Sequence, residues 1–272
     1  MLTKSQQIRL SILDMVFKAG SGHVGGSLSA VEILLALYDE VMRIDAGNPK
    51  WEERDRFILS KGHAAPVLYA VLAYKGFFPV EHLNSLRSFG GILQGHPDMR
   101  KTPGLDFSSG SLGQGISVGI GMALALKRKK IDSGIYVLLG DGELNEGQIW
   151  EAALSAPKLK TDRLICIVDR NGVQLDGKTE DIMPLEPLEE KWRAFRWNTF
   201  MANGHDIADI TEKLCAAKIK SLKNGAPSVI IARTVKGNGV PFMEGKYMWH
   251  GGVMSAEQYE EAVRAVRDGE LT

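Results

Sequence analysis

The sequence predicts an α/β fold with a mostly parallel sheet that is covered by helices on both faces. Two observations predict this class. Short apolar runs rich in β-branched residues alternate with helical segments along most of the chain, as at residues 135–139, 164–168 and 228–234. Gly-rich polar loops follow several of these runs. Loops of this kind build the ligand site in such sheets.

The composition is that of an ordinary globular protein and excludes several functional classes. The chain has 272 residues, 44% of them hydrophobic and 24% charged, with 33 basic and 33 acidic side chains. The formal net charge is therefore zero, and no overall electrostatic field attracts nucleic acid or an anionic membrane. No signal peptide is apparent, and no apolar run approaches the roughly 18 residues of a membrane span. Cys166 and Cys215 lie in apolar segments and are expected to be buried free thiols, which favours a cytoplasmic location.

The first half of the chain begins with a helical stripe of apolar residues over positions 5–19, which ends at Gly20. A flexible Gly-rich loop, residues 21–27, comes next. Ser29 and Glu32 predict a capping box that opens a helix through residue 42.

A short strand over residues 54–60 then leads into helices over 65–75 and 80–88. Residues 89–113 are rich in Gly, Pro and Ser, and a stretch of that length without regular structure is often functional. A helix with many small residues follows over 115–130.

The second half continues the alternation. After the central unit described below, the expected elements are a helix at 185–195, a strand at 197–202, a helix capped by Asp206 that runs to 223, a strand at 228–234, a Gly-rich loop at 236–252 and a last helix at 256–267.

The central unit is a β-α-β segment with polar residues at the end of both strands. One apolar run ends in Gly140-Asp141-Gly142, and a second ends in Asp169 to Gly172. Because parallel strands end at the same edge of a sheet, Asp141 and Asn171 are expected to meet there. Their oxygens suit Mg²⁺ or Ca²⁺, and the glycines let a ligand approach the backbone. The intervening helix is expected to point its free N–H groups at this place, which favours a phosphate. The unit therefore predicts a binding site for a diphosphate and a metal ion, called the diphosphate seat below.

The histidines are the second group that carries chemistry. Four of the six lie in Gly-rich loops and can converge on one sheet edge, which raises the chance of a functional role. These four are His23, His63, His96 and His250. None is spaced like a zinc ligand. The remaining two, His82 and His205, are expected to be structural.

These motifs resemble a known family. Gly-Asp-Gly followed about 30 residues later by Asn resembles the thiamine diphosphate motif, and the wording of residues 140–177 resembles transketolase in particular. Further transketolase-like motifs occur in the right order along nearly the whole chain. They are Ser21-Gly22-His23, the strand end at 57–63, Gly95-His96-Pro97, the GSLGQG run at 110–115 and Trp249-His250-Gly251.

The resemblance implies thiamine diphosphate as the cofactor, held with Mg²⁺, for which Ca²⁺ or Mn²⁺ are alternatives. The implied metal ligands are Asp141, Asn171 and the carbonyl oxygen of Val173. The implied cofactor contacts come from His63, Gly110, Leu112, Asp141, Gly142, Asn171, Lys236 and His250.

The resemblance also implies catalytic roles. His23, His96 and His250 would hold the hydroxyl groups of a ketose and assist proton transfer, for which neutral histidines are suited. Glu146 would join a proton-linked network between paired sites. The implied reaction moves a two-carbon ketol unit from a ketose phosphate to an aldose phosphate.

The family's full chain continues into a domain that binds the pyrimidine ring of the cofactor, and nothing in residues 1–272 resembles that domain. We therefore expect a single thiamine diphosphate-binding domain, the N-terminal subunit of a split transketolase. It would be active only with a C-terminal subunit, in an α2β2 complex, on sugar phosphates and without nucleic acid or membrane partners.

Several alternatives stay open from the sequence. Pentose phosphates are the default substrates, but modified or sulfonated sugars also fit. The α chain of a thiamine-dependent 2-oxoacid dehydrogenase carries a similar Gly-Asp-Gly and Asn, although the four loop histidines argue against it. A non-catalytic binding or regulatory homologue is the third reading, which the intact Asp141, Asn171 and Glu146 disfavour.

Overall fold

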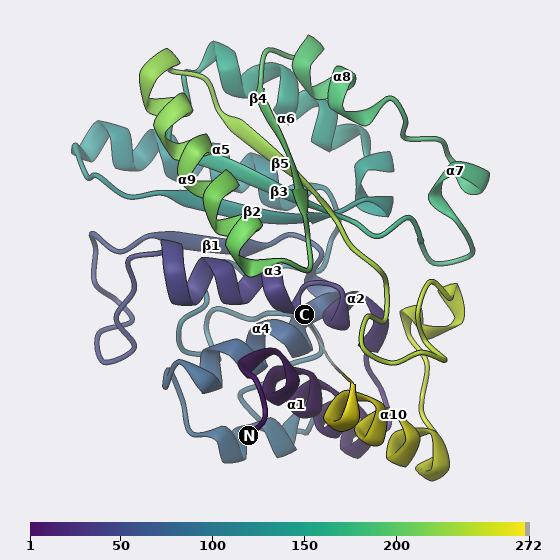
Figure 1. Cartoon of the computed structure of the whole chain (residues 1–272). Helices are drawn as coiled ribbons and strands as arrows, with labels where there is room; N and C mark the ends of the chain where they lie inside the picture. The colour runs from purple at the N-terminus through teal and green to yellow at the C-terminus, as the bar shows by residue number, and fades with distance from the viewer. Residues whose placement is uncertain (270–272) are drawn as a thin grey trace.

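Residues 1–269, which a computed structural model describes, contain five parallel strands in one sheet (Figure 1). The strands are β1 (Arg56–Leu59), β2 (Ile135–Gly140), β3 (Leu164–Arg170), β4 (Asn198–Asn203) and β5 (Ser228–Arg233), and their order across the sheet is β1-β2-β3-β5-β4. Each neighbouring pair is parallel. The predicted α/β class is confirmed.

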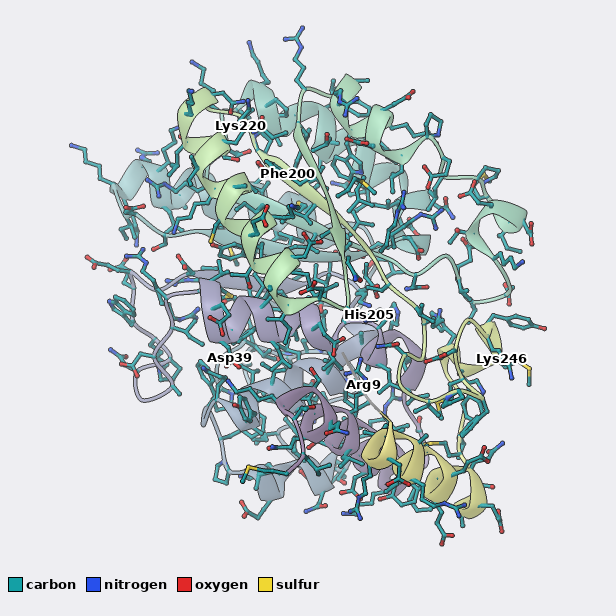
Figure 2. All side chains as sticks on the ribbon, in the orientation of Figure 1. Arg9, Asp39, Phe200, His205, Lys220 and Lys246 are labelled. Atoms are coloured by element: carbon teal, nitrogen blue, oxygen red, sulfur yellow. The ribbon has the colours of Figure 1, made fainter. Side chains whose placement is uncertain are left out.

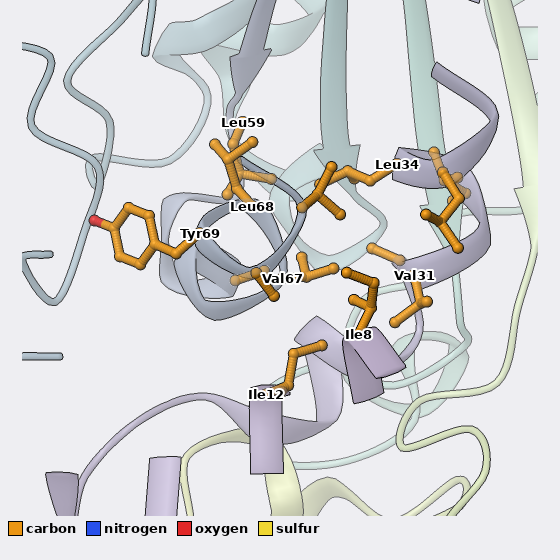
Figure 3. Close-up of a cluster of buried hydrophobic side chains, with 14 of the residues drawn as sticks. Ile8, Ile12, Val31, Leu34, Leu59, Val67, Leu68 and Tyr69 are labelled. Atoms are coloured by element: carbon orange, nitrogen blue, oxygen red, sulfur yellow. The ribbon is translucent and has the colours of Figure 1, made fainter. Parts of the chain in front are cut away.

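One face of the sheet belongs to a core that is shared with a layer of helices. These helices are α1 (Lys4–Ala19), α2 (Val24–Leu28), α3 (Val31–Leu35), α4 (Ala65–Tyr74) and α9 (Ile207–Asn224). Figure 3 shows part of this core, where Ile8 and Ile12 of α1 approach Val31 and Val67. All four side chains are buried, so α1 is held by its apolar stripe rather than by its surface charges.

The opposite face packs against α5 (Gln114–Lys129), α6 (Gly147–Lys158) and α8 (Leu188–Ala194). Strand residues alternate between the two cores: Leu138 points to the first and Val137 to the second. The indole of Trp192 is fully buried, and its ring centroid lies 5.4 Å from that of Trp150 and 4.9 Å from that of Trp197. Burial on both faces explains why the central strands read as continuous apolar runs.

The shorter elements gather at the carboxyl end of the strands, to the right in Figure 1. They include 3-10 turns at Gly62–Ala64, Gly142–Asn145 and Tyr247–His250, and α7 (Thr179–Ile182). Gly140 on β2 pairs with Asp169 on β3, and Asp169 pairs with Ala232 on β5, so three strands end at the same level. The loops that follow these strands therefore converge.

Several local expectations are confirmed. Helix α1 ends at Gly20, whose φ of 57° is left-handed, and Asp206 caps α9 by accepting N–H donors of Ala208 and Asp209. No helix or strand interrupts the described chain between the 3-10 turn Val80–Ser85 and α5. The final helix is α10 (Ala256–Asp268). No helix within residues 1–269 is long and apolar enough to span a membrane.

Several expectations are wrong. Residues 24–27, expected in a flexible loop, belong to α2, and the helix expected at 80–88 is a 3-10 turn over Val80–Ser85. Ser29 and Glu32 form no capping box: the helix begins only at Val31, and its last part, Ala36–Val41, is a π-helix that continues α3 directly. Tertiary partners take both side chains, because the Ser29 hydroxyl donates to Asp169 and Glu32 forms an ion pair with Arg9. Cys166 is a buried free thiol as predicted, but Cys215 is exposed on α9.

Candidate active site at the carboxyl edge of the sheet

A cavity of about 230 Å³ opens where the loops after β1, β2, β3 and β5 converge. Its polar lining is supplied by Lys61, His63, Asp141, Glu143, Asn171, Gln174, Lys236 and His250. Gly26, Gly140 and Gly142 supply backbone. A side chain at Gly26 would project toward the His63 ring and the Lys61 ammonium, with its Cβ 3.6 Å from His63 Nε2, so glycine keeps this wall open.

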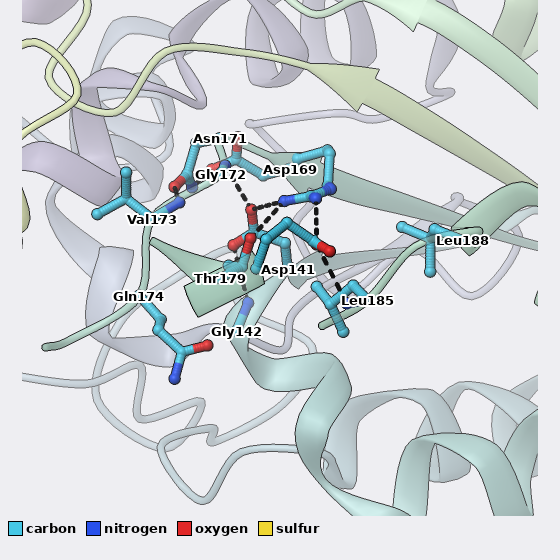
Figure 4. A network of polar contacts seen from close by, with 12 residues as sticks. Asp141, Gly142, Asp169, Asn171, Gly172, Val173, Gln174, Thr179, Leu185 and Leu188 are labelled. Carbon is cyan, nitrogen blue, oxygen red and sulfur yellow. Dashed lines mark hydrogen bonds and ion pairs between the residues drawn. The ribbon is translucent and has the colours of Figure 1, made fainter. Parts of the chain in front are cut away.

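Asp141 and Asn171 lie together in this cavity, as the β-α-β unit predicts. The Asp141 carboxylate accepts N–H donors of Gly142 at 2.8 Å and of Gly172 at 2.6 Å, and it accepts Arg170 Nη1 at 3.2 Å (Figure 4). Burial, with the neighbouring Asp169 charge, raises the pKa of Asp141. Three donors thus fix the carboxylate of a 2% exposed side chain.

The other two predicted metal ligands are also oriented. Asn171 donates through Nδ2 to Asp169 at 3.3 Å, which leaves its Oδ1 to accept the Val173 N–H at 3.1 Å. The Val173 carbonyl accepts Lys236 Nζ at 3.0 Å. A carboxylate, an amide oxygen and a carbonyl are hard donors that fit Mg²⁺ or Ca²⁺. No group of three His, Cys, Asp or Glu side chains within the described residues is arranged to hold a metal ion.

The sequence reasoning missed a buried ion pair beneath the cavity. Lys61 Nζ donates to Asp169 and, at 2.8 Å, to the Gly26 carbonyl. Ser29 and Thr234 hydroxyls also donate to Asp169, which is fully buried. Burial opposes ionisation of Asp169, but Lys61 and the hydroxyls hold its pKa below the ordinary value. Their positions could have indicated this pair, because Lys61 follows β1 and Asp169 lies at the end of β3.

Glu143 is a second residue that the sequence reasoning missed. Its carboxylate accepts N–H donors of Gly113 at 2.8 Å and Gly140 at 2.9 Å, and burial raises its pKa. The 3-10 turn Gly142–Asn145 directs this side chain inward. That turn also corrects the expected helix N-terminus: α6 begins only at Gly147, and none of its residues lines the cavity.

The formal charges on the lining nearly cancel. Lys61 and Lys236 are the cations, and Asp141 and Glu143 are the carboxylates. Burial lowers the pKa of Lys236 to about 8, so its ammonium stays mostly charged at neutral pH. Its Nζ also lies 3.0 Å from His250 Nδ1, which ties the 236–252 loop to the cavity.

The four predicted loop histidines form one cluster. The His23 ring lies 5.2 Å from His63, 6.3 Å from His96 and 5.4 Å from His250, and His63 stacks on His250 at 4.9 Å. His63 and His250 line the cavity, while His23 and His96 extend the cluster beyond it. Their convergence was predicted from the sequence and is confirmed.

These rings are held neutral. Burial, with nearby cations, lowers the pKa of His23 to about 4 and that of His250 to about 3. The pKa of His63 falls well below its ordinary value for the same reason, and that of His96 falls through burial and the Arg87 charge. A neutral imidazole both donates and accepts a hydrogen bond, which suits hydroxyl groups. His23 Nδ1 is buried without a partner within the described residues.

The remaining predicted residues divide into two groups. Leu112 lines the cavity, and Gly110 lies against His96, whose ring would be 3.4 Å from a Cβ at that position. Glu146 lies outside the lining: it is exposed at the start of α6. The structure therefore does not bring Glu146 into the cavity with the other candidate residues.

His205 belongs to a separate buried cluster rather than to the cavity, as expected for a structural histidine. It contacts Glu32 through Nδ1 at 3.2 Å and accepts the Val235 N–H through Nε2 at 2.8 Å. Arg9 forms two bonds with Glu32 and donates to the Asn238 carbonyl. Figure 2 labels Arg9 on α1 and His205 in the turn before α9, and Glu32 of α3 connects these two side chains. This cluster anchors the segment that carries Lys236.

Comparisons with known proteins agree with this geometry. Residues 3–267 match the family described as transketolase, thiamine diphosphate binding domain. The chain is 49% identical over 256 residues to a 6-deoxy-6-sulfo-D-fructose transketolase subunit of Clostridium sp. (strain MSTE9), covering 94% of this chain and 92% of that protein. It is 44% identical over 265 residues to an apulose-4-phosphate transketolase subunit of Phocaeicola vulgatus, covering 97% of this chain and 93% of that protein.

Among solved structures, transketolase from Campylobacter jejuni superposes with a TM-score of 0.88 at 31% identity. The alignment covers 98% of this chain but only 43% of that one. This chain thus spans nearly the whole of two proteins named as subunits and less than half of a solved enzyme.

Proposed function

This chain belongs to the transketolase family, and we propose that it is the subunit that holds the diphosphate end of thiamine diphosphate in a transketolase built from two kinds of subunit. The observation that carries the proposal is the cavity that combines Asp141 and Asn171 with His63 and His250, next to which His23 and His96 complete a cluster of four histidines. Residues 1–272 would form one cofactor-binding domain, and the partner would hold the pyrimidine ring.

The lining fits the proposed cofactor. Lys61 and Lys236 offer positive charge to a diphosphate, neutral His63 offers a hydrogen-bond donor, and Gly26 leaves space for it. Asp141, Asn171 and the Val173 carbonyl would hold Mg²⁺ or a similar cation. When bound, thiamine diphosphate supplies a stabilised carbanion, which makes cleavage beside a ketose carbonyl feasible.

The histidine cluster explains how this chain would position a sugar. Neutral His23, His96 and His250 would hold ketose hydroxyl groups and move protons between them, because each neutral ring has one donor and one acceptor. The partnerless Nδ1 of His23 is one group that a sugar hydroxyl would satisfy. A 2-oxoacid substrate has no comparable need for four such rings, which favours transketolase over the 2-oxoacid dehydrogenase reading.

Glu146 supports a proposed pairing of active sites. Its exposure at the start of α6 leaves its carboxylate available to a second copy of the chain, as a proton-linked network in an α2β2 complex requires. The names of the two related subunits state no stoichiometry, so the α2β2 assembly is our proposal. A cytoplasmic location is likewise proposed.

The proposed substrate is a ketose with a distal anionic group. The two related subunits are named for 6-deoxy-6-sulfo-D-fructose and apulose 4-phosphate, which carry a sulfonate and a phosphate. We propose that this chain serves a sugar of that class, with ordinary pentose phosphates as the alternative. The ketol unit would pass to an aldose.

The test combines this chain with a transketolase-type pyrimidine-binding subunit. Transfer is measured from ketose phosphates and from a sulfonated ketose, by this chain alone, by the mixture and by a mixture carrying Asp141→Ala. We expect transfer only by the intact mixture, and Mg²⁺-dependent cofactor binding that Asp141→Ala abolishes without unfolding the chain. Turnover by the isolated chain, or cofactor binding that survives Asp141→Ala, would refute the proposal.

A further inference from the structure

Arg170 joins the Asp141 carboxylate to the loop that follows β3. Its Nη1 donates to Asp141 at 3.2 Å and to the Thr179 hydroxyl at 2.7 Å. Its Nη2 donates to Glu180 at 2.9 Å and to Glu186 at 3.2 Å. The side chain is only 12% exposed. One guanidinium therefore connects the end of β2 with the middle of the loop, at Thr179 and Glu180, and with its far end, at Glu186; Figure 4 shows the dashed lines around Asp141 and Thr179.

The loop in question, residues 172–187, carries backbone groups of the cavity. The Gly172 N–H is the shortest donor to Asp141, at 2.6 Å, and Val173 lines the cavity. Val173 pairs with Lys178 across a short antiparallel bridge, and the Thr179 N–H donates to the Gly172 carbonyl at 3.0 Å. A displacement of this loop would therefore move groups that contact or line the diphosphate seat.

Apolar packing holds the loop at its two ends, through Val173 and through Leu185, which is 2% exposed and belongs to the core beneath α5 and α6. Between residues 172 and 184 only Val173 and Thr179 are buried, whereas Leu175, Ile182 and Met183 are exposed by 60%, 46% and 56%. Helix α7 has four residues, too few to be stable by itself. The polar contacts to Arg170 are thus the main anchor of the stretch between these ends, residues 174–184.

The carboxylates around Arg170 strengthen that conclusion. Asp141, Glu180 and Glu186 all direct an oxygen at the same guanidinium. Glu180 also accepts the Leu185 N–H, and Glu186 accepts the Leu188 N–H, so the loop's return is fixed through the same side chains. Without Arg170, these three carboxylates would lose the one cation that contacts all of them.

We propose that Arg170 is a positioning residue that holds the 172–187 loop closed against Asp141 and so keeps the Gly172 N–H and the Val173 carbonyl in place at the diphosphate seat. This inference rests on the proposed function only for the identity of the ligand. The guanidinium is needed for its shape as well as its charge, because its two Nη groups serve different partners. A lysine at this position would supply charge at one point only.

The experiment compares Arg170→Met, Arg170→Lys and the control Arg233→Met. Arg233 ends β5 in register with Arg170, and its charge acts on Glu186, but it forms no ion pair within residues 1–269. Hydrogen exchange of the full-length chain is measured without cofactor. We expect amides of residues 174–185 to exchange at least about tenfold faster in Arg170→Met, by an intermediate factor in Arg170→Lys, and at the wild-type rate in Arg233→Met, with β2 and β3 unchanged.

The second readout is Mg²⁺ titration at saturating thiamine diphosphate, with the pyrimidine-binding subunit present. Residues that orient metal ligands typically change affinity about 10- to 100-fold, so Arg170→Met should weaken Mg²⁺ binding by about tenfold. Unchanged loop exchange would overturn the inference, and so would faster exchange with unchanged or tighter Mg²⁺ binding. If the wild-type complex binds no Mg²⁺ and cofactor, the proposed function fails, while the exchange measurement still decides whether Arg170 clamps the loop.

Discussion

Glu32→Gln is the substitution whose effect follows most directly from the structure. Glu32 is 2% exposed, forms two bonds with Arg9, and contacts His205. Burial opposes its ionisation, but His205 and Arg9 lower its pKa from 4.5 to about 2. At 1.36 kcal/mol for each pKa unit, that difference corresponds to about 3 kcal/mol of folding free energy at neutral pH. The substitution also leaves Arg9 buried without its carboxylate partner, so the loss of folding free energy could reach an upper limit of about 5 kcal/mol.

The sign of the pH dependence follows from the lowered pKa. The stabilisation is fully present above the unfolded pKa near 4.5, and it is lost as pH falls toward the folded pKa near 2. Urea unfolding of wild type and Glu32→Gln should therefore differ by about 3 kcal/mol at about pH 7, and by about half as much near pH 3. Glu52→Gln, which removes an exposed ion pair with Lys129, is the control and should cause no measurable change.

Two results would refute this reasoning. One is a Glu32→Gln protein as stable as wild type at neutral pH. The other is a stability difference that stays constant from neutral pH to about pH 3, since it would mean that Glu32 has the same pKa in the folded and unfolded states.

Three further predictions follow from buried or crowded groups. Gly115→Ala should cost about 1–3 kcal/mol in urea unfolding, because its Cβ would lie 2.6 Å from the Cβ of the serine that follows β1, whereas Gly121→Ala on the same helix meets open space and should be neutral or stabilising. Asp169→Asn should lower the free energy of unfolding by about 3–5 kcal/mol, because it leaves buried Lys61 without its carboxylate partner. The double variant Asp169→Asn, Lys61→Met should recover part of that loss, and strictly additive losses would contradict the pairing. The His23 ring should remain neutral down to about pH 5 in an NMR titration, and protonation near its ordinary pKa would show that it is not buried as described.

The sequence predicted the parts of this molecule that depend on topology. Asp141 and Asn171 meet because β2 and β3 are parallel neighbours, so that their carboxyl ends lie at one edge of the sheet. The four histidines converge for the same reason, since each lies in a loop rather than within a strand or a regular core helix. Such relations need only the order of strands and loops.

The parts that it did not predict depend on contacts between distant residues. Glu143 resembles a surface charge in a helix, yet a 3-10 turn directs it at N–H groups of Gly113 and Gly140. Ser29 and Glu32 have the spacing of a cap, but their bonds to distant residues are the ones formed. Local spacing offers the same oxygens to several partners, and the choice among them is made only when the core is assembled.

The near cancellation of charge around the cavity has a thermodynamic consequence. Two lysines, two carboxylates and neutral histidines leave little net charge to receive an anion as strong as a diphosphate. A diphosphate bound alone would leave its negative charge uncompensated, and a divalent cation bound alone would leave its positive charge uncompensated. The two should therefore behave as coupled ligands, each raising the affinity for the other by the same factor. A divalent cation bound here would act as a counter-charge to the diphosphate, so the proposed site should favour the two together over either one alone.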